Sequence, residues 1–318
     1  MAENPLVSVV ICTYNAGDCL RPAIQSILEQ TYSRLEVLVV DDGSDDGSVT
    51  SARQAFADPR VRWFRQENAG KPVALNWAIR ELRGEFYAIQ DADDLSYPNR
   101  IERLVLAMQR QPEVAAVFSG HDLIIDGRHL APRFRVKNAA ACCRDVDRYA
   151  MPAHDPTAMY RMAMVRDIQY DTDLRVGQGY DYMLRVGEQW PMIVLGECLY
   201  SYRVSSSSVT RSDPQRRQKL VLEVIRRACQ RRGIPFEQRP VSSRRLRGGA
   251  SFRDNNIAAQ FIDSVLDQRR AGQWFSAIRT GLQCINLHPL DMHYHKAFVY
   301  ALSPWWLIRR LRRTGSEE

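Results

Sequence analysis

The first 120 residues alternate between two hydrophobic patterns. Continuous apolar runs, rich in β-branched residues, occupy residues 7–12 and 35–40, and the apolar residues between them recur at helical spacing. The alternation continues with apolar runs at residues 61–64, 86–89 and 114–118 and with helical patterns at 72–82 and 101–108. A strand and a helix repeating about every 25 to 30 residues are typical of a mostly parallel, twisted sheet with helices on both faces. The pattern predicts an α/β fold.

Each predicted strand is followed by polar residues. They are Thr13, Tyr14 and Asn15 after the first strand, residues 41–47 after the second, 67–71 after the third and 91–94 after the fourth. A single Asp-Gly-Ser loop is usually only a turn that caps a helix. However, ligands of such sheets bind beyond the carboxyl ends of the strands, so four polar ends on one edge favour a binding site.

The fourth strand end is the most acidic. Asp91, Asp93 and Asp94 place three carboxylates within four residues. Their mutual repulsion is unfavourable unless a hard cation lies among them, and Mg²⁺ and Mn²⁺ are the cations that suit carboxylate oxygens. We therefore expect a Mg²⁺ or Mn²⁺ cofactor at this edge.

Composition limits the class of protein. With 45% apolar and 25% charged residues, the chain is globular, and it has no run of about 18 apolar residues that could span a bilayer. The first residues show no basic segment followed by an apolar run, and the seven cysteines show no paired spacing. We expect a cytoplasmic protein whose cysteines are small core residues.

Charge divides the chain unevenly. Residues 203–318 carry 22 Lys and Arg against 9 Asp and Glu, whereas residues 1–202 carry 22 against 28. Helical apolar spacing predicts a basic helical extension over residues 212–318, and its charge suits an anionic partner. Residues 304–313 contain two tryptophans and four arginines. This combination is typical of segments that lie in the interface of an anionic membrane. The alternative is a terminal helix docked on the protein by its tryptophans.

Six stretches together resemble the family 2 glycosyltransferases. They are VSVVICTYNAG, LEVLVVDDGSDDGS, ENAGKPVALNWAI, QDADD, HDPTAMYR and LYSYRVSSSSVTR, within roughly residues 5–211. The resemblance implies the glycosyltransferase A fold, with a catalytic domain over 1–211. That domain would comprise a Rossmann-like donor-binding half, 1–120, and an acceptor half, 121–211. Its activity would move a sugar from a nucleotide-diphosphate donor to an acceptor hydroxyl with inversion.

The resemblance also implies roles at the strand ends. Thr13, Tyr14 and Asn15 would lie along the nucleobase and ribose, and Asp42 would accept a hydrogen bond from a base N–H. Asp91 and Asp93 would form the family's DxD motif, with Asp93 ligating the metal.

Four further residues are candidates on the donor side. Lys71 would add a cation near the phosphates, and Gly70 would allow close backbone approach. A lysine in a loop is more often solvated, so this alternative stays open for Lys71. Asn76 matches a donor-side asparagine of the family, although helix capping or surface exposure would also explain it. Arg203 is a candidate diphosphate contact.

The catalytic side departs from the family's pattern. The family supplies its base from a Glu-Asp pair at a helix start, followed by Leu-Arg. If the family's Leu-Arg is aligned with Leu184-Arg185, the acid pair falls on Gln178-Gly179. If the acid itself is aligned instead, the base is Asp181, which we favour. An acid there could instead stabilise the helix N-terminus. The family's Tyr-Arg-x-His motif corresponds to residues 202–205, where a serine replaces the histidine. His154 is a candidate group on the acceptor side.

The sequence favours an inverting, metal-dependent transferase of the hexosyltransferase type, acting in cell-envelope polysaccharide or glycolipid assembly. Its partners would be a UDP-, GDP- or dTDP-sugar, a saccharide or lipid-linked acceptor and an anionic membrane surface on the inner face of the cell membrane. One alternative is a catalytically impaired nucleotide-sugar-binding relative that acts as a partner subunit. A nucleotidyltransferase would need a glycine-rich loop after the first strand, and nucleic acid is not expected because the basic tail has no reader motif.

Overall fold

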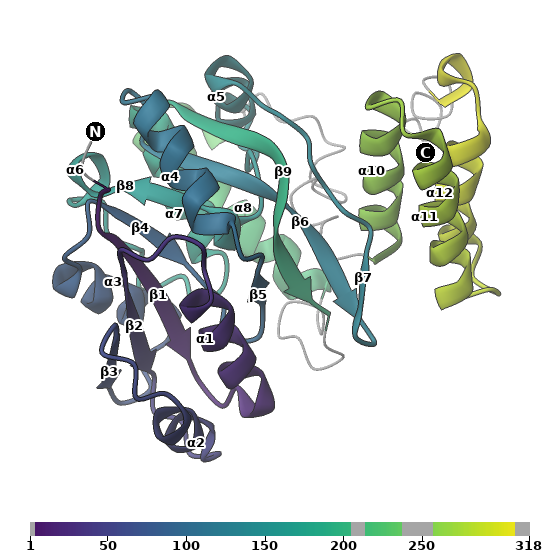
Figure 1. The fold of residues 1–318 in the computed structure, drawn as a ribbon. Coiled ribbons are helices and arrows are strands. Elements are labelled where there is room, and N and C mark those ends of the chain that lie inside the picture. The colour runs from purple at the N-terminus through teal and green to yellow at the C-terminus, as the bar shows by residue number, and fades with distance from the viewer. Residues whose placement is uncertain (1–3, 205–213, 237–256, 309–318) are drawn as a thin grey trace.

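The computed structural model describes residues 4–204, 214–236 and 257–308, and its core is one curled sheet (Figure 1). Strands β1 (Val7–Thr13), β2 (Leu35–Asp41), β3 (Val61–Arg65) and β4 (Phe86–Ile89) form a parallel half in the order β3-β2-β1-β4. The expected parallel, Rossmann-like arrangement is confirmed for this half.

The sheet becomes mixed beyond β4. Strand β8 (Met159–Arg161) is antiparallel to both β4 and β6 (Ala116–Ile125), and β9 (Met192–Arg203) runs parallel to β6. The short strands β5 (Leu95–Ser96) and β7 (Arg128–Leu130) pair antiparallel with β9 and β6. As a result β9, the last strand in the chain, lies beside residues that directly follow β4.

Helices cover both faces of the sheet, as the continuous apolar strand runs require. They are α1 (Leu20–Leu28), α2 (Ser48–Ala55), α3 (Lys71–Glu81), α4 (Arg100–Arg110), α5 (Ala139–Asp147), α6 (Met162–Val165), α7 (Gln178–Gln189) and α8 (Pro214–Arg231), with short 3-10 turns η1 (Gly17–Cys19) and η2 (Asp155–Thr157). In β1, Val9 and Ile11 pack with α1 and α4, whereas Val10 belongs to the core formed with α3, α7 and α8.

Helix α8 changes the expected domain boundary. Its Val221, Val224, Ile225 and Ala228 are buried in the core that α3 and α7 share. The structure thus packs α8 against the sheet and its helices, whereas we expected the extension to begin at residue 212.

Three C-terminal helices form a separate layer beside β6 and β7 (Figure 1). They are α10 (Ile257–Arg270), α11 (Trp274–Leu287) and α12 (Met292–Leu302). Phe261 and Val265 of α10 pack with Leu123 and Leu130 in a small core of their own. The Ser264 hydroxyl donates to the Pro132 carbonyl at 2.7 Å.

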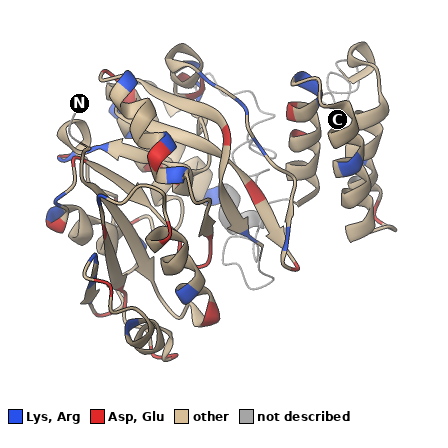
Figure 2. Ribbon diagram, viewed as in Figure 1, with Lys and Arg blue, Asp and Glu red and all other residues tan. Residues whose placement is uncertain are grey.

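These helices are less basic than the whole C-terminal part. Residues 257–308 contain four Lys and Arg against three Asp, and Figure 2 shows both basic and acidic residues on these helices. Most of the positive excess therefore lies in α8 and in residues 237–256 and 309–318, and the latter two ranges are outside the described residues. All seven cysteines are free, and three of them are buried. In the described part of the chain, every helix is too short or too polar to cross a bilayer.

Candidate active site

The carboxyl ends of β1 and β2 are joined by side-chain hydrogen bonds. The Asn15 amide donates to an Asp45 carboxylate oxygen at 2.9 Å and accepts from the Asp45 backbone N–H at 3.0 Å. Just before it, Thr13 is buried with no partner for its hydroxyl among the described residues, and the Tyr14 ring is 53% exposed. The loop therefore presents an aromatic face and a free hydroxyl at the sheet edge.

Asp42 organises the loop that leads into α3. Its carboxylate accepts hydrogen bonds from the Gln66 side chain at 2.7 Å and from the backbone N–H groups of Ala69 and Gly70, each at 2.9 Å. Gly70 has a φ of +95°, a conformation that favours glycine, and it immediately precedes the first turn of α3. Asp42 thus fixes the loop from which α3 begins, and it uses the N–H groups of Ala69 and Gly70 to do so.

The three acids after β4 form one cluster. Carboxylate oxygens of Asp91, Asp93 and Asp94 all lie within 4.8 Å of one another. Asp94 is fully buried, and β9 binds it: the Tyr200 hydroxyl donates at 2.9 Å and the Arg203 backbone N–H at 2.7 Å. The Arg203 side chain also donates to the Asp93 carbonyl at 2.9 Å. The last strand therefore holds two acids of the cluster in place.

Lys71 is part of this cluster. Its ammonium group pairs with the Asp91 carboxylate at 2.5 Å. Burial alone would lower the pKa of Lys71, but the attraction of Asp91 outweighs it and the pKa is raised. Lys71 is thus an ion-paired, half-buried residue at the start of α3, and its contact with the phosphates stays a prediction.

The cluster has an excess of negative charge. Burial raises the pKa of Asp94 well above its usual range, and the charges of Asp91 and Asp93 raise it further. Burial and the Asp91 charge also raise the pKa of Asp93, which no Lys or Arg side chain in the described residues pairs with. Hard oxygen donors grouped this closely fit Mg²⁺ or Mn²⁺, because such a cation would relieve the repulsion that raises these pKa values.

A buried arginine, which the sequence analysis missed, links the cluster to η2. The Arg100 guanidinium is fully buried and donates to the carbonyls of Ile89 at 3.0 Å and Pro156 at 2.6 Å. Burial lowers its pKa to about 10. Its only sequence signal is its place at the start of an amphipathic helix, where an exposed arginine would look the same. Arg100 thus ties η2 to the end of β4.

Two titratable side chains stand at η2, on the side of the acceptor half. Burial raises the pKa of Asp155 to about 6 and lowers that of His154 to about 4. The His154 Nε2 is buried with no hydrogen-bond partner in the described part of the chain, and its ring lies 4.9 Å from that of His121. Among the described residues, the Asp155 carboxylate accepts one long side-chain hydrogen bond, 3.5 Å, from the Tyr160 hydroxyl.

Asp181 does not lie where a base needs to be. Its side chain is 1% exposed, and its two oxygens accept from Arg185 at 2.8 Å and Arg231 at 2.9 Å. Because both carboxylate oxygens bind guanidinium groups, we propose a structural role for Asp181 in place of the base that we expected. Its role is to fasten α8 to α7.

Asn76 also has a structural partner. Its amide donates to the Tyr170 carbonyl at 2.8 Å and accepts from the Tyr170 N–H at 2.7 Å. Both ends of the amide are therefore used within the protein, and Asn76 is buried, not capping or exposed. Asn76 thus has a structural role, and its contact with a donor stays a prediction.

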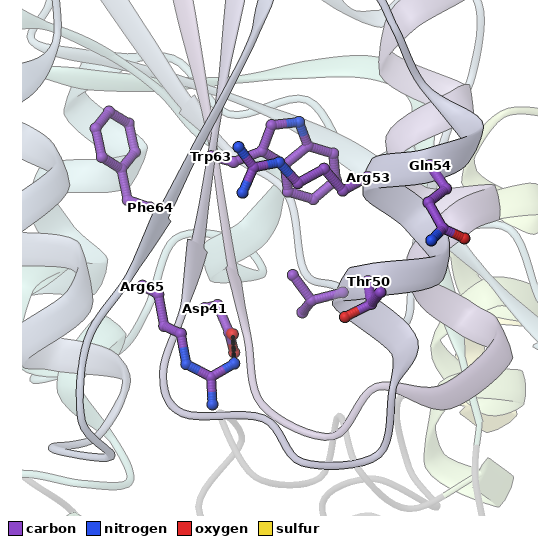
Figure 3. A pocket seen from close by; sticks show the side chains of 8 residues that line it. Asp41, Thr50, Arg53, Gln54, Trp63, Phe64 and Arg65 are labelled. Atoms are coloured by element: carbon purple, nitrogen blue, oxygen red, sulfur yellow. Dashed lines mark hydrogen bonds and ion pairs between the residues drawn. The ribbon is translucent and has the colours of Figure 1, made fainter.

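Two cavities lie near these elements. One of about 210 Å³ opens between the sheet, α5 and α10, and its lining includes His121, His154, Arg133 and Lys137. A larger one of about 480 Å³ lies between α2 and β3, lined by Asp41, Arg53, Trp63, Arg65 and their neighbours (Figure 3). The acid cluster lines neither, and the first cavity adjoins it through His154.

With this geometry in place, the comparisons decide the family. The family model of glycosyl transferase family 2 matches residues 8–168, half of the 318 residues. The chain belongs to the family 2 glycosyltransferases. The match contains all four polar strand ends, the acid cluster and η2.

Curated relatives are themselves uncharacterized glycosyltransferases. One from Methanocaldococcus jannaschii is 26% identical over 210 residues, covering 64% of this chain and 72% of the relative. One from Escherichia coli is 40% identical over 117 residues, covering 36% of this chain and 34% of the relative. The chain matches only 18% of the length of a relative from Rickettsia bellii, to which it is 36% identical over 121 residues and 38% of its own length.

Solved structures share the fold. A mannosyltransferase from Pyrobaculum calidifontis, in complex with GDP-Man and Mn²⁺, has a TM-score of 0.57 and 23% identity, covering 95% of this chain and 86% of that one. TarS 1–349 from S. aureus, in complex with UDP, has a TM-score of 0.55 and 17% identity, covering 92% and 90%. The glycosyltransferase A fold expected from the sequence is confirmed.

Proposed function

We propose that this protein transfers a sugar from a nucleotide-diphosphate donor to an acceptor hydroxyl, with inversion at the anomeric carbon and with a divalent cation. The observation that carries the proposal is the cluster of Asp91, Asp93 and Asp94 beside Lys71, at the sheet edge where such folds bind ligands. Membership of the family supports it.

The donor would lie across the carboxyl ends of β1, β2 and β4. Thr13, Tyr14 and Asn15 would flank the nucleobase and ribose, where Tyr14 offers an exposed ring. Asp42 would accept a base N–H while it holds the loop before α3. The α3 N-terminus at Gly70 would face the diphosphate, because the positive end of the helix dipole favours anions.

The phosphates would meet the cationic side of the cluster. Lys71 and Arg203 would stand beside the diphosphate, and Asp91 and Asp93 would hold Mg²⁺ or Mn²⁺. The bound cation would offset the charge that develops on the leaving diphosphate oxygen. The chain's own residues would hold this arrangement in place, because Tyr200 and Arg203 of β9 bind the Asp94 carboxylate.

Donor and acceptor are proposed as classes. Solved relatives contain UDP, UDP-GlcNAc or GDP-Man, and we propose a UDP-, GDP- or dTDP-sugar here. The acceptor would be a saccharide or a lipid-linked sugar of cell-envelope polysaccharide or glycolipid assembly. It would enter through the 210 Å³ cavity, with His154 at its inner end.

We also propose that the protein works in the cytoplasm, peripherally on the inner face of the cell membrane. The C-terminal layer exposes large apolar side chains: Trp274 (52%), Phe275 (88%), Leu290 (99%), Met292 (71%) and Trp306 (65%). Apolar side chains and arginines together suit an anionic membrane interface. The arginines of the proposed 304–313 segment, at 309, 310, 312 and 313, lie outside the described residues.

The test is nucleotide release. The protein is incubated with UDP-GlcNAc, GDP-mannose or a dTDP-hexose and Mn²⁺, with and without an envelope glycolipid extract, and the freed nucleoside diphosphate is measured. We expect release from one donor, faster with extract and lost with a chelator. The engaged state of Asp181 favours one rival, a catalytically impaired donor-binding subunit; binding of a donor without any release would support that rival.

A further inference from the structure

An inverting transfer needs a carboxylate on the acceptor side. The acceptor oxygen attacks the anomeric carbon more readily when a base takes its proton in the same step. Asp181 is closed off by Arg185 and Arg231, and Asp91 is paired with Lys71. The base must therefore be sought elsewhere on the elements that border the acid cluster.

Asp155 occupies the right part of the molecule. It begins η2, which packs against β4, β6 and α7. Arg100 binds the Pro156 carbonyl at 2.6 Å and the Ile89 carbonyl at 3.0 Å, so the residue next to Asp155 is tied to the strand end that carries Asp91. Lys71 and Asp91 are close enough for their charges to act on the Asp155 carboxyl.

The start of α7 contains a gap that the Asp155 side chain fills. A Cβ atom placed on Gly179 would lie 1.9 Å from Asp155 Oδ2 and 2.4 Å from Asp155 Cγ. No side chain at position 179 is compatible with the present position of Asp155. Anchoring on Leu184-Arg185 assigns the family's acid pair to Gln178-Gly179 in this chain. The carboxyl group missing from residue 179 is thus replaced, in the same space, by one from η2.

We propose that Asp155 is the general base of the transfer, an inference that rests on the proposed function. The acceptor oxygen forms a bond to the anomeric carbon as the bond from that carbon to the diphosphate oxygen breaks. The electron pair of the broken bond leaves with the nucleoside diphosphate. The acceptor proton passes to the Asp155 carboxylate, which then releases it to water.

Neighbouring groups suit this role less well. Burial lowers the pKa of His154 to about 4, so its imidazole is neutral near pH 7 but a weak proton acceptor. Burial raises the pKa of Asp155 to about 6, which leaves it ionised near pH 7 and more basic than an ordinary aspartate. A base is most effective when its pKa lies near the working pH.

The first experiment compares Asp155→Asn with Asp173→Asn. Asp173 is an exposed acid of the same half and is the matched control, because its substitution makes the same chemical change. Release of UDP from UDP-GlcNAc and of GDP from GDP-mannose is measured with Mn²⁺, and binding of UDP and GDP is measured by titration. We expect a loss of about 10²- to 10⁴-fold in kcat for Asp155→Asn, with unchanged nucleotide affinity and melting temperature.

The second experiment moves the carboxylate from residue 155 to residue 179. Asp155→Ala opens the space beside residue 179, and adding Gly179→Asp returns a carboxylate to it from α7. We expect the double variant to release nucleotide at least tenfold faster than Asp155→Ala alone. Gly179→Asp by itself should lower the melting temperature, because its side chain collides with Asp155.

The outcomes separate the two proposals. Wild-type protein that releases nothing from any donor would contradict the proposed function, and the base assignment with it. Active wild type with an equally active Asp155→Asn variant would overturn the base assignment alone. A loss of nucleotide affinity as large as the loss of rate would also overturn the base assignment, because Asp155 would then contribute to folding or to donor binding. A double variant that releases nucleotide no faster than Asp155→Ala would refute the inference that a carboxylate on residue 179 can replace that of Asp155.

Discussion

The proposed donor half and the proposed acceptor half build their sites in different ways. On the proposed donor side, the acids of one strand end, Asp91 to Asp94, lie at the same sheet edge as the loops after β1 and β2. On the acceptor side, Asp155 comes from η2 and fills a space on α7, whereas the acid within α7 itself, Asp181, binds two arginines. Chemistry carried by consecutive residues is visible as a motif, but chemistry shared between elements is not.

The largest effect that tests this contrast is expected at the acid cluster. Asp93→Ala should remove the Mn²⁺-dependent stabilisation by UDP or GDP, which is about 2.7 kcal/mol at a ligand concentration 100 times the dissociation constant. It should also abolish nucleotide release. Calorimetry with and without Mn²⁺ measures the first effect. An unchanged melting shift would remove Asp93 from the cation site.

Asp181→Asn should act on stability and not on the chemical step. The substitution leaves Arg185 and Arg231 without their shared carboxylate, which we expect to cost about 2 to 3 kcal/mol of unfolding free energy because both arginines are partly exposed. Urea unfolding measures this loss. The kcat of the folded fraction should stay within about threefold of wild type; a loss as large as that expected for Asp155→Asn would restore Asp181 as the base.

Asp42→Ala should have a smaller effect, on the affinity for the nucleotide. The variant should weaken binding of UDP or GDP by about 1.5 to 2 kcal/mol, since it removes a charged acceptor and loosens the Gly70 loop. Isothermal titration measures the affinity, and Asp173→Asn again serves as the control. Equal affinities for Asp42→Ala and wild type would leave Asp42 with a turn-stabilising role only.

The smallest effect should come from the C-terminal layer. Phe275→Ser together with Trp306→Ser should reduce co-sedimentation with phosphatidylglycerol vesicles several-fold. Nucleotide release should be spared, because both rings are exposed and belong to the separate C-terminal layer. Removal of residues 304–318 should abolish co-sedimentation, and binding of the intact protein should weaken with salt, at about 1 kcal/mol per arginine. Intact protein that never sediments with vesicles would contradict the membrane proposal.

The sequence predicted the parts of the site that depend on local order. The strand runs, the start of α3 at Lys71 and the acid cluster follow from hydrophobic spacing and from consecutive residues. It could not show that Asn76 binds Tyr170 or that Asp181 binds Arg231, because those partners are 94 and 50 residues away. It could not place α8 either, since an amphipathic pattern shows that a helix has an apolar face but not which core receives it.

The bonds from β9 to Asp94 have a consequence for when the site can form. Asp94 meets Tyr200 and Arg203 across 106 and 109 residues of chain, and contacts that distant are made late in folding. During synthesis, a nascent chain that already carries every strand-end motif would still lack a finished acid cluster until residue 203 leaves the ribosome. A fragment that ends at residue 120 would therefore lack the β9 groups that hold Asp94.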